Sequence, residues 1–361
     1  MKRVVIFTNH SFMLWQFRRE LIQAMLGSGM EVIIGVPFGE RIDDFQKLGC
    51  RMINTPLERR GINPFRDFKL LRQYFRILKA AKPDMVVTYS IKPNIYAGWA
   101  CRCLRIPYCV NVQGLGTAFQ KPFMARIVTI MYHVALKRAK VIFFENIKNA
   151  ELFREKKIST AKQEVILRGA GINLDHYPLQ PYPRNDTIRF LYVGRLMKEK
   201  GIEELFSAAK MLYDDCYDIC LDLVGFFEDS YKEQIQVLCD AGIAHFHGFQ
   251  DDPRPFYANA DCVVLPSYHE GMSNVLLEGA ASGRPIITSY IPGCREAVDQ
   301  GVSGFTCRTR NKYGLYEAMR KVASMTREQR EAMGLEGRQR MEEFFDKNLV
   351  VEQTMNAIFE S

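Results

Sequence analysis

SYHEGMSNVLLE, residues 267–278, places two glutamates eight residues apart, Glu270 and Glu278. It follows an apolar run, Cys262–Leu265, that predicts a buried strand, and it precedes helix-like sequence that stops at Gly283 and Pro285. We therefore expect Glu270 in the loop at the carboxyl end of a strand and Glu278 about one turn inside the next helix. In open α/β sheets, ligands bind in the crevice at these strand ends.

The residues between the two glutamates suit an anionic ligand. Gly271 lets the backbone approach a ligand closely, and Ser273 is placed to be the N-cap of the helix. The backbone N–H groups around Met272, Ser273 and Asn274 would then face an anion such as a diphosphate. On spacing alone, a capped helix with two surface carboxylates is an equally good interpretation.

A second element lies about seventy residues upstream. Arg189–Val193 predicts a strand that runs into GRLMKEKG, residues 194–201, and a helix is expected from Ile202. Arg195 and Lys200 flank this tight loop, where an arginine can bind a diphosphate as a fork and a lysine as a point charge. Together the two elements form a specific pattern, which neither forms alone.

Three further segments complete the pattern: LVG at 223–225, HGF at 247–249 and ADCVVLPS at 260–267. With them the chain resembles the family 4 glycosyltransferases of the GT-B fold. The resemblance implies an α/β architecture of two doubly wound, Rossmann-like domains that face each other across a cleft. It also implies donor contacts at Gly225 and Phe249, in addition to the residues of the two loops.

The length and composition of the chain limit its fold class and its location. A chain of 361 residues with 47% hydrophobic residues can bury two cores. No apolar run approaches the ~20 residues of a spanning helix, and the run at 4–7 is too short for a signal peptide. The ten cysteines are scattered, which is typical of reduced thiols in a cytoplasmic protein, and the spacing of Cys101 and Cys103 suits neither zinc nor redox chemistry.

Charge is divided unevenly along the chain. Residues 1–180 carry 29 Lys and Arg against 13 Asp and Glu, and residues 181–361 carry 20 against 28. A basic half suits an anionic membrane surface, a polyanionic substrate or nucleic acid. Chance surface bias is the alternative.

The first half alternates strands and helices, which predicts a doubly wound parallel sheet. Strands are expected at Arg3–Thr8, Glu31–Val36, Arg51–Asn54, Asp84–Thr88, Tyr108–Val112, Val141–Phe144 and Glu164–Leu167. Helices are expected at Gln16–Leu26, Phe65–Ala81, Ile95–Leu104, Phe123–Lys137 and Lys148–Glu155.

A cluster of prolines at 178, 181 and 183 marks a linker. We therefore expect an N-terminal acceptor-binding domain at 1–177 and a C-terminal nucleotide-sugar-binding domain at 184–344. By analogy with the family, the last helix, 345–361, is assigned to the first domain.

Two stretches of the first half combine cations with apolar residues. Between Arg59 and Lys82 one acid, Asp67, accompanies eight cations, namely Arg59, Arg60, Arg66, Lys69, Arg72, Arg76, Lys79 and Lys82. Phe65, Phe68 and Phe75 are interleaved with them. The stretch indicates either a surface helix with a core-facing stripe or a helix that rests on a membrane. The second stretch, 119–140, places Phe119 and Phe123 beside Lys121 and Arg126 and is expected to form an apolar rim beside the cleft.

The first domain has its own candidate site residues, which we assign to acceptor binding through the resemblance. Asn9 and His10 follow the first strand, where many relatives carry paired glycines, and His10 is more often structural than catalytic at such a place. Lys92 and Asn94 open a helix and suit an anion. Gln113 and Gly114 follow the strand Tyr108–Val112, with Leu115 and Gly116 next, and Glu145-Asn146 ends another strand.

Many family members place a histidine where Gln113 stands. A glutamine cannot act as a general base, so we expect Gln113 to hydrogen-bond the transferred sugar. Lys92-x-Asn94, the QGLG run and the basic first half together resemble bacterial enzymes that extend polyprenyl-diphosphate-linked sugars. Several of these add N-acetylgalactosamine, so a UDP-sugar donor, a lipid-linked acceptor and peripheral attachment at the inner face of the cell membrane are expected.

The resemblance implies a retaining mechanism without a metal or other cofactor, and no Asp-x-Asp motif stands where a metal–diphosphate site would be expected. Arg195, Lys200 and the helix start would then stabilise the leaving UDP. Glu270 would hold the donor sugar and Glu278 the ribose hydroxyls. The acceptor would attack from the leaving-group face, and its proton would pass to the departing phosphate.

Other functions fit less well. A nicotinamide dehydrogenase would share the doubly wound sheet, but this chain has no Gly-x-Gly-x-x-Gly after its first strand. A GT-B sugar-nucleotide epimerase matches fewer motifs, and the donor-loop residues disfavour a nucleic-acid binder. A transferase with a soluble acceptor and a non-catalytic subunit of a glycosyltransferase complex stay open as alternatives.

Overall fold

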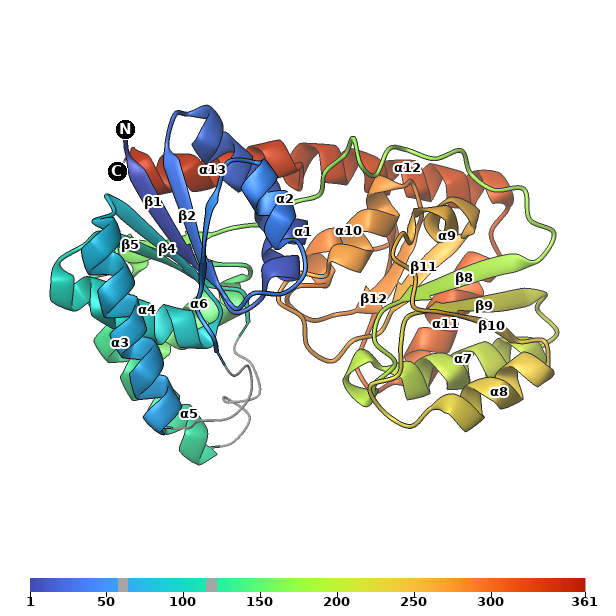
Figure 1. The fold of residues 1–361 in the computed structure, drawn as a ribbon. Helices are drawn as coiled ribbons and strands as arrows, with labels where there is room; N and C mark the ends of the chain where they lie inside the picture. Colours follow the sequence, from blue (N-terminus) through green and yellow to red (C-terminus); the bar gives the residue numbers. More distant parts are fainter. Residues whose placement is uncertain (58–63, 115–121, 361) are drawn as a thin grey trace. The chain divides into compact units, whose positions relative to one another are not determined.

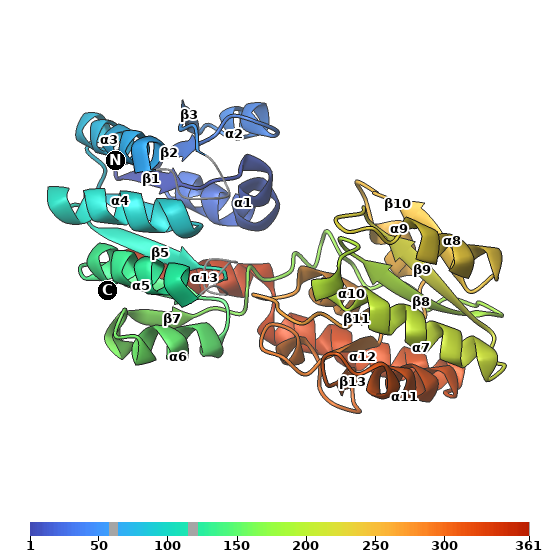
Figure 2. The same ribbon diagram turned by 90° about the horizontal axis from the view of Figure 1, so that it is seen from below.

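The computed structural model describes residues 1–57, 64–114 and 122–360, which form two compact units. The first is Met1–Ala170 with Asn348–Ser361, and the second is Gly171–Lys347 (Figures 1 and 2). The boundaries expected from the sequence are residues 177 and 344, several residues from these. Arg59 and Arg60 of the basic stretch lie outside the described residues, as do Leu115, Gly116, Phe119 and Lys121.

The first unit holds a seven-stranded parallel sheet with the order β3-β2-β1-β4-β5-β6-β7. Its strands are β1 (Arg3–Phe7), β2 (Glu31–Val36), β3 (Arg51–Asn54), β4 (Met85–Tyr89), β5 (Tyr108–Val112), β6 (Val141–Phe144) and β7 (Glu164–Ile166). Its helices are α1 (Ser11–Gly27), α2 (Ile42–Lys47), α3 (Pro64–Ala81), α4 (Ile91–Leu104), α5 (Pro122–Leu136), α6 (Ile147–Glu155) and α13 (Lys347–Phe359). All seven expected strands are present within a residue of their predicted ends, whereas α2 was not predicted.

The second unit holds a six-stranded parallel sheet with the order β10-β9-β8-β11-β12-β13. Its strands are β8 (Ile188–Val193), β9 (Ile219–Val224), β10 (Ala244–Gly248), β11 (Cys262–Leu265), β12 (Ile286–Ser289) and β13 (Gly304–Cys307). Its helices are α7 (Ile202–Asp214), α8 (Lys232–Asp240), α9 (Arg254–Asn259), α10 (Asn274–Ala281), α11 (Lys312–Ala323) and α12 (Arg327–Phe344). The expected pair of doubly wound domains is confirmed.

Both sheets are covered on two faces, and this explains the sequences of their strands. Central strands such as β4 and β11 are buried along their whole length, so they read as continuous apolar runs rather than alternating ones. In each sheet the strand order reverses once, between β1 and β4 in the first and between β8 and β11 in the second. The loops after these four strands therefore flank the switch points, where doubly wound folds bind ligands.

The proline-containing segment 178–183 is held firmly on the second unit. The guanidinium of Arg284 is fully buried and donates to the carbonyl oxygens of Gln180 and Pro181 and to two carbonyls at the end of α9. Arg327 donates to the carbonyls of Tyr182 and Pro183. Burial lowers the pKa of Arg284 to about 10, and carbonyl dipoles and the Tyr182 ring, 5.3 Å away, stabilise its charge.

The last helix, α13, packs on the first unit. Val350 and Ile358 are buried in the same core as β1 and β2, and the Lys140 ammonium donates to the carbonyl of Ile358 at 2.9 Å. Because the chain returns in this way, the first unit is built from two separate parts of the sequence.

Helices α3, α4 and α5 lie side by side on one face of the first sheet (Figure 2). Phe65 and Phe68, near the start of α3, are 89% and 68% exposed. Among residues 1–57, 64–114 and 122–360, no helix combines the length and the apolar character needed to cross a membrane.

Candidate active site

The two loops of the second switch point are packed together. Gly201 ends the loop after β8 with φ of +70°, and a Cβ there would lie 2.2 Å from the carbonyl oxygen of Pro266, in the loop after β11. The N–H of Tyr268 donates to the carbonyl of Glu199 across the same contact. This packing requires a glycine at position 201 and fixes the two loops against each other.

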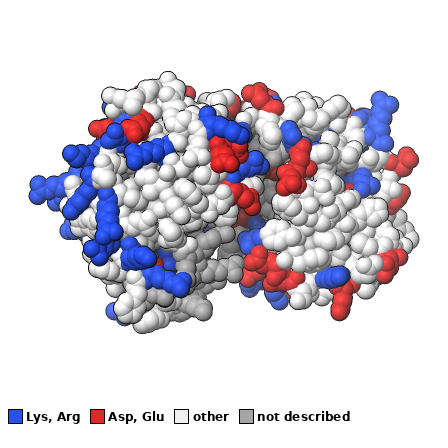
Figure 3. Space-filling model, in the orientation of Figure 1, with Lys and Arg blue, Asp and Glu red and all other residues white. Residues whose placement is uncertain are grey.

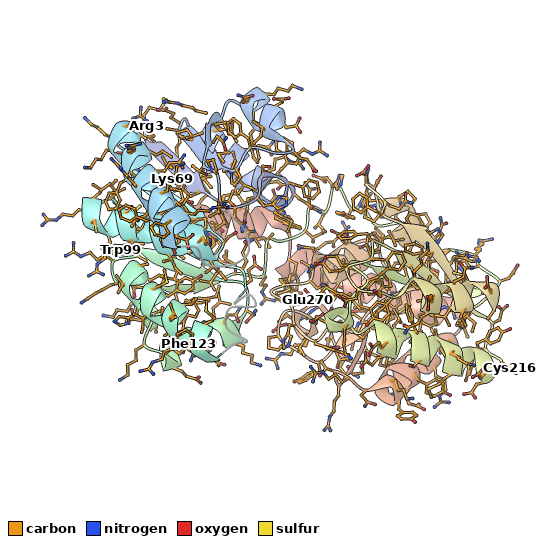
Figure 4. All side chains as sticks on the ribbon, turned by 60° about the horizontal axis from the view of Figure 1, so that its bottom comes forward. Arg3, Lys69, Trp99, Phe123, Cys216 and Glu270 are labelled. Carbon is orange, nitrogen blue, oxygen red and sulfur yellow. The ribbon has the colours of Figure 1, made fainter. Side chains whose placement is uncertain are left out.

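The packed loops bring Lys200 to Glu270. The ammonium of Lys200 lies 2.5 Å from a carboxylate oxygen of Glu270, and both side chains are largely buried, with 20% and 13% exposed. Figure 4 labels Glu270 at this edge of the second unit. A cation and a carboxylate therefore stand next to each other, as the resemblance implies for residues that would bind a diphosphate and its sugar.

Arg195 lies on the same loop and is more exposed. Its guanidinium pairs with Glu228 at 3.3 Å, and their side chains are 44% and 28% exposed. Such an exposed pair contributes little to stability, so an anionic ligand can replace the carboxylate at low cost. Glu228 was not singled out from the sequence, because the pairing depends on the loop after β9.

Glycines stand at the carboxyl ends of three neighbouring strands, β8, β9 and β10. Gly194 comes after β8 and Gly225 after β9, and the N–H of Gly225 donates to the carbonyl of Gly248 at 2.8 Å. A Cβ on Gly225 would lie 1.8 Å from the carbonyl oxygen of Gly194, so a side chain is excluded there. Beside them Phe249 is 61% exposed and meets Phe226 edge-to-face at 6.2 Å. The exposed rings of Phe226 and Phe249 therefore form an apolar surface beside the glycine backbone, and this surface has the character that a nucleobase needs for stacking.

The start of α10 differs from the expectation in one detail. Ser273 occupies the N-cap position, but its side chain makes no capping hydrogen bond, and its N–H donates to the carbonyl of Gly293. The free donors of the helix are therefore the N–H groups that follow it, beginning at Asn274. Met272 is buried in the core, so its backbone alone can face a ligand, and Gly271 remains partly exposed.

Glu278 is more deeply buried than the sequence indicates. Only 7% of it is exposed, and its carboxylate accepts a hydrogen bond from the Tyr257 hydroxyl at 2.8 Å. Tyr177 is a second hydrogen-bonding partner. Burial raises the pKa of the Glu278 carboxyl to about 7, although the two tyrosine hydroxyls and Lys347 act in the opposite direction.

The candidate residues of the first unit also lie at strand ends. The hydroxyl of Ser90, after β4, donates to the side-chain oxygen of Asn9, after β1, at 2.7 Å. Ser90 has φ of 74° and ψ of 155°, a conformation that is essentially restricted to glycine. His10 precedes α1 and packs edge-on against Phe12.

The other predicted residues of this unit differ in how accessible their side chains are to a ligand. Lys92 pairs with Asp67 of α3 at 2.7 Å, so an anion bound there would compete with this carboxylate. Asn94 is buried, and its amide donates to the carbonyl of Asn111 on β5. Gln113 is half-buried, and Gly114 is exposed.

Two further groups of polar residues can be placed. Glu145 pairs with Arg18 of α1 at 2.9 Å, and Asn146 caps α6 by accepting from the N–H of Asn149. In the second unit Cys220, Asp222 and His245 are close enough to share a metal ion. Both oxygens of Asp222 already accept hydrogen bonds, from Arg189 and from His247, so a metal would have to displace these partners.

Two family profiles match the chain. "Glycosyl transferase 4-like domain" matches residues 14–169, and "Glycosyl transferases group 1" matches residues 187–325. The chain belongs to the family 4 glycosyltransferases. The expected activity class, a hexosyltransferase, is thereby confirmed, and the matched ranges follow the two units of the fold.

Relatives of this glycosyltransferase include an N,N'-diacetylbacillosaminyl-diphospho-undecaprenol alpha-1,3-N-acetylgalactosaminyltransferase of Campylobacter jejuni. It is 27% identical over 84% of this chain and 85% of the relative. The capsular polysaccharide glycosyltransferase CapM of Staphylococcus aureus is 27% identical over 93% and 91%. An Escherichia coli UDP-Gal:alpha-D-GlcNAc-diphosphoundecaprenol alpha-1,3-galactosyltransferase is 26% identical over 74% and 73%.

Solved structures support the fold of this glycosyltransferase. Anabaena HepE in complex with UDP and glucose superposes with a TM-score of 0.81 at 15% identity, over the full length of both chains. The lipopolysaccharide outer core galactosyltransferase WaaB superposes with a TM-score of 0.75 at 19% identity, over 100% of this chain and 99% of WaaB. The GT-B architecture expected from the motifs is confirmed.

Proposed function

We propose that this glycosyltransferase moves a sugar, an N-acetylhexosamine, from a UDP-sugar to a polyprenyl-diphosphate-linked saccharide in the synthesis of a surface or glycoprotein glycan. The observation that carries the donor assignment is the Lys200–Glu270 pair at the switch point of the second sheet. The acceptor class rests on the relatives whose names specify undecaprenol-diphosphate-linked substrates.

The arrangement around Lys200 supports a reaction that needs no metal. Lys200 and Arg195 supply positive charge for the leaving diphosphate, and the first N–H groups of α10 add to it. Glu270 then accepts hydrogen bonds from the donor sugar. In this proposal the acceptor attacks from the leaving-group face, its proton passes to the departing phosphate, and the anomeric configuration is retained.

An assay of sugar transfer tests this proposal directly. The purified protein is incubated with a set of UDP-sugars and a polyprenyl-diphosphate-linked disaccharide, with and without EDTA. We expect acceptor-dependent UDP release with a UDP-N-acetylhexosamine, unchanged by EDTA, and an α-linked product by NMR. Transfer to a soluble saccharide alone would favour the soluble-acceptor alternative, and abolition by EDTA would contradict the metal-free mechanism.

The first unit supports attachment to an anionic membrane surface. Exposed apolar side chains occur on three adjacent helices, with Phe65 and Phe68 on α3, Trp99 on α4 and Phe123 on α5. Lys and Arg gather around α3 in Figure 3, and Figure 4 labels Lys69, Trp99 and Phe123 on these helices. Each cation near an anionic surface contributes about 1 kcal/mol, screened by salt.

Vesicle binding checks the membrane part of the proposal. We expect the protein to pellet with anionic vesicles at low salt, to be released at high salt, and to be lost from the pellet when Arg66, Arg72 and Arg76 are changed to glutamate. A matched control carries the same charge reversal at exposed lysines of the second unit, Lys210, Lys232 and Lys312. Equal loss in both triple variants would show that net charge, and not this face, determines binding.

A further inference from the structure

Two tyrosines from separate segments converge on Glu278. Tyr257 comes from α9 and Tyr177 from the segment that precedes β8, and both hydroxyls hydrogen-bond the carboxylate. Their rings meet edge-to-face at 6.2 Å. Tyr257 is fully buried, whereas Tyr177 keeps part of its surface exposed.

The two phenols have a clear physical role at this place. A buried carboxylate without partners would be costly, and hydrogen bonds to its oxygens both favour its charged form and fix its orientation. Glu278 lies in the second turn of α10, the helix whose start follows Glu270. It is therefore held in one orientation, on the helix that follows the loop of Glu270.

Other charged groups face this cluster. Lys347, at the start of α13, favours the charged form of Glu278. Asp252 and Arg254 act on Tyr177, and Arg338 of α12 donates to the carbonyl of Tyr177 at 2.9 Å. These charges are present in every variant considered below, so they do not account for a difference between a tyrosine and a phenylalanine.

We propose that Tyr177 and Tyr257 are positioning residues for the donor. Their hydrogen bonds favour the charged form of Glu278 and align its carboxylate so that it accepts hydrogen bonds from the ribose hydroxyls of the nucleotide. This inference rests on the proposed UDP-sugar site and adds to it the residues that make Glu278 competent. Nothing in the spacing of the sequence indicates either tyrosine, because each reaches Glu278 only through the fold.

The experiment compares two nucleotides, UDP and 2′,3′-dideoxy-UDP, which lacks the ribose hydroxyls. Calorimetry measures both affinities for the wild type, Tyr177→Phe and Tyr257→Phe. We expect each variant to lose about three- to tenfold in UDP affinity, the effect of one hydrogen bond, and to bind the dideoxy nucleotide as the wild type does.

The pH dependence gives a second readout that a merely structural role would not change. Ionised Glu278 accepts from the ribose, so UDP affinity of the wild type should fall as the pH drops through about 7. Removing a phenol donor disfavours the carboxylate, so the midpoint should move to higher pH in both variants. The affinity for the dideoxy nucleotide should lack this transition.

Tyr182→Phe is the matched control. Tyr182 lies in the same segment as Tyr177 and is buried, but its hydroxyl donates to the carbonyl of Asp261 at 2.6 Å. The control loses the same kind of hydrogen bond without touching Glu278, so its UDP affinity and pH profile should match those of the wild type. Thermal melting of all variants confirms that they fold, and the partly exposed Tyr177 provides a test if Tyr257→Phe does not.

Several outcomes would overturn the inference. Equal weakening of UDP and dideoxy-UDP binding in the tyrosine variants would show a structural role only, and unchanged UDP affinity would show no role. A wild type that binds both nucleotides equally would separate Glu278 from the ribose while leaving the UDP site intact. A wild type that binds neither would contradict the proposed function itself.

Discussion

The carboxyl ends of the two sheets share one topology and differ in how their charges are used. At the second sheet, Arg195 pairs with Glu228 through side chains that are 44% and 28% exposed. At the first sheet, Arg18 pairs with Glu145 through side chains that are 6% and 13% exposed. A ligand can replace the partner in an exposed pair, whereas a buried pair loses most of its stabilisation when one member leaves. The Arg195–Glu228 pair therefore suits exchange with a ligand, whereas the Arg18–Glu145 pair mainly holds α1 against the sheet.

The largest expected effect concerns the buried carboxyl of the second unit. Burial raises the pKa of Glu278 to about 7 from 4.5. In the folded protein this carboxyl therefore keeps its proton at pH values where the same carboxyl has lost it in the unfolded chain. The free energy of unfolding therefore falls as pH rises from 4.5 to 7, by up to about 3 kcal/mol. We expect Glu278→Gln to remove this slope and to be more stable than the wild type at pH 8, measured by urea unfolding from pH 4 to pH 8.

The same variant should bind UDP more weakly, because an amide is a poorer acceptor for ribose hydroxyls than a carboxylate. Gain of stability with loss of binding would identify Glu278 as a residue kept for the ligand. A wild type with the same stability at pH 5 and pH 8 would contradict the raised pKa.

The next largest effect concerns the donor diphosphate. Lys200→Ala removes a charge-assisted hydrogen bond, and we expect UDP binding to weaken by about 1.5–3 kcal/mol in calorimetry. Lys198→Ala is the matched control, because Lys198 lies on the same turn but is 64% exposed and pairs with the exposed Glu203 at 3.5 Å. If the control weakens binding as much as Lys200→Ala, then the loop attracts the diphosphate only by its general charge.

A smaller effect should distinguish the first unit. Lys92 and Asp67 form a pair with side chains 16% and 6% exposed, so they are expected to couple helices α3 and α4. In a double-mutant cycle with Lys92→Met and Asp67→Asn, we expect a coupling free energy of about 1 kcal/mol in unfolding. UDP binding should be unchanged in all three variants. No measurable coupling would leave Lys92 available to an acceptor phosphate.

The smallest expected effect concerns the shape of the pH–rate profile. Gln113 has no titratable group, so Gln113→Ala should lower the transfer rate and leave the shape of the pH–rate profile unchanged. Steady-state kinetics across the pH range measures this. Loss of one limb of the profile in the variant would mean that Gln113 orients a group that transfers a proton.

Features that depend on neighbouring residues could be predicted from the sequence. The strands are short apolar runs bounded by glycine and polar residues, so β2, β5, β6 and β11 match the predicted ranges at both ends. The donor loops are local motifs, and the spacing of Arg195, Lys200, Glu270 and Glu278 could be read directly. The short helix α2 has only six residues, which is too few to show an apolar periodicity.

Contacts between distant segments could not be predicted. Lys92 was assigned to an anion, but its partner Asp67 lies on another helix. Glu278 was expected to accept from ribose hydroxyls, but the sequence does not show that Tyr177 and Tyr257, from two other segments, hydrogen-bond its carboxylate. A single sequence shows spacing along the chain, whereas these pairings depend on how helices and loops pack.

The buried Arg284 bears on how the two halves of such enzymes can be exchanged. Its hydrogen bonds attach the prolines of 178–183 to the second unit, so a cut there would separate a guanidinium from the carbonyls that stabilise its charge. Gly169 and Gly171, with φ of 65° and 69°, lie instead where the contacts change from one unit to the other. A recombinant enzyme with a new donor specificity should therefore receive residues 171–347 as a single insert, joined at these glycines and before Asn348.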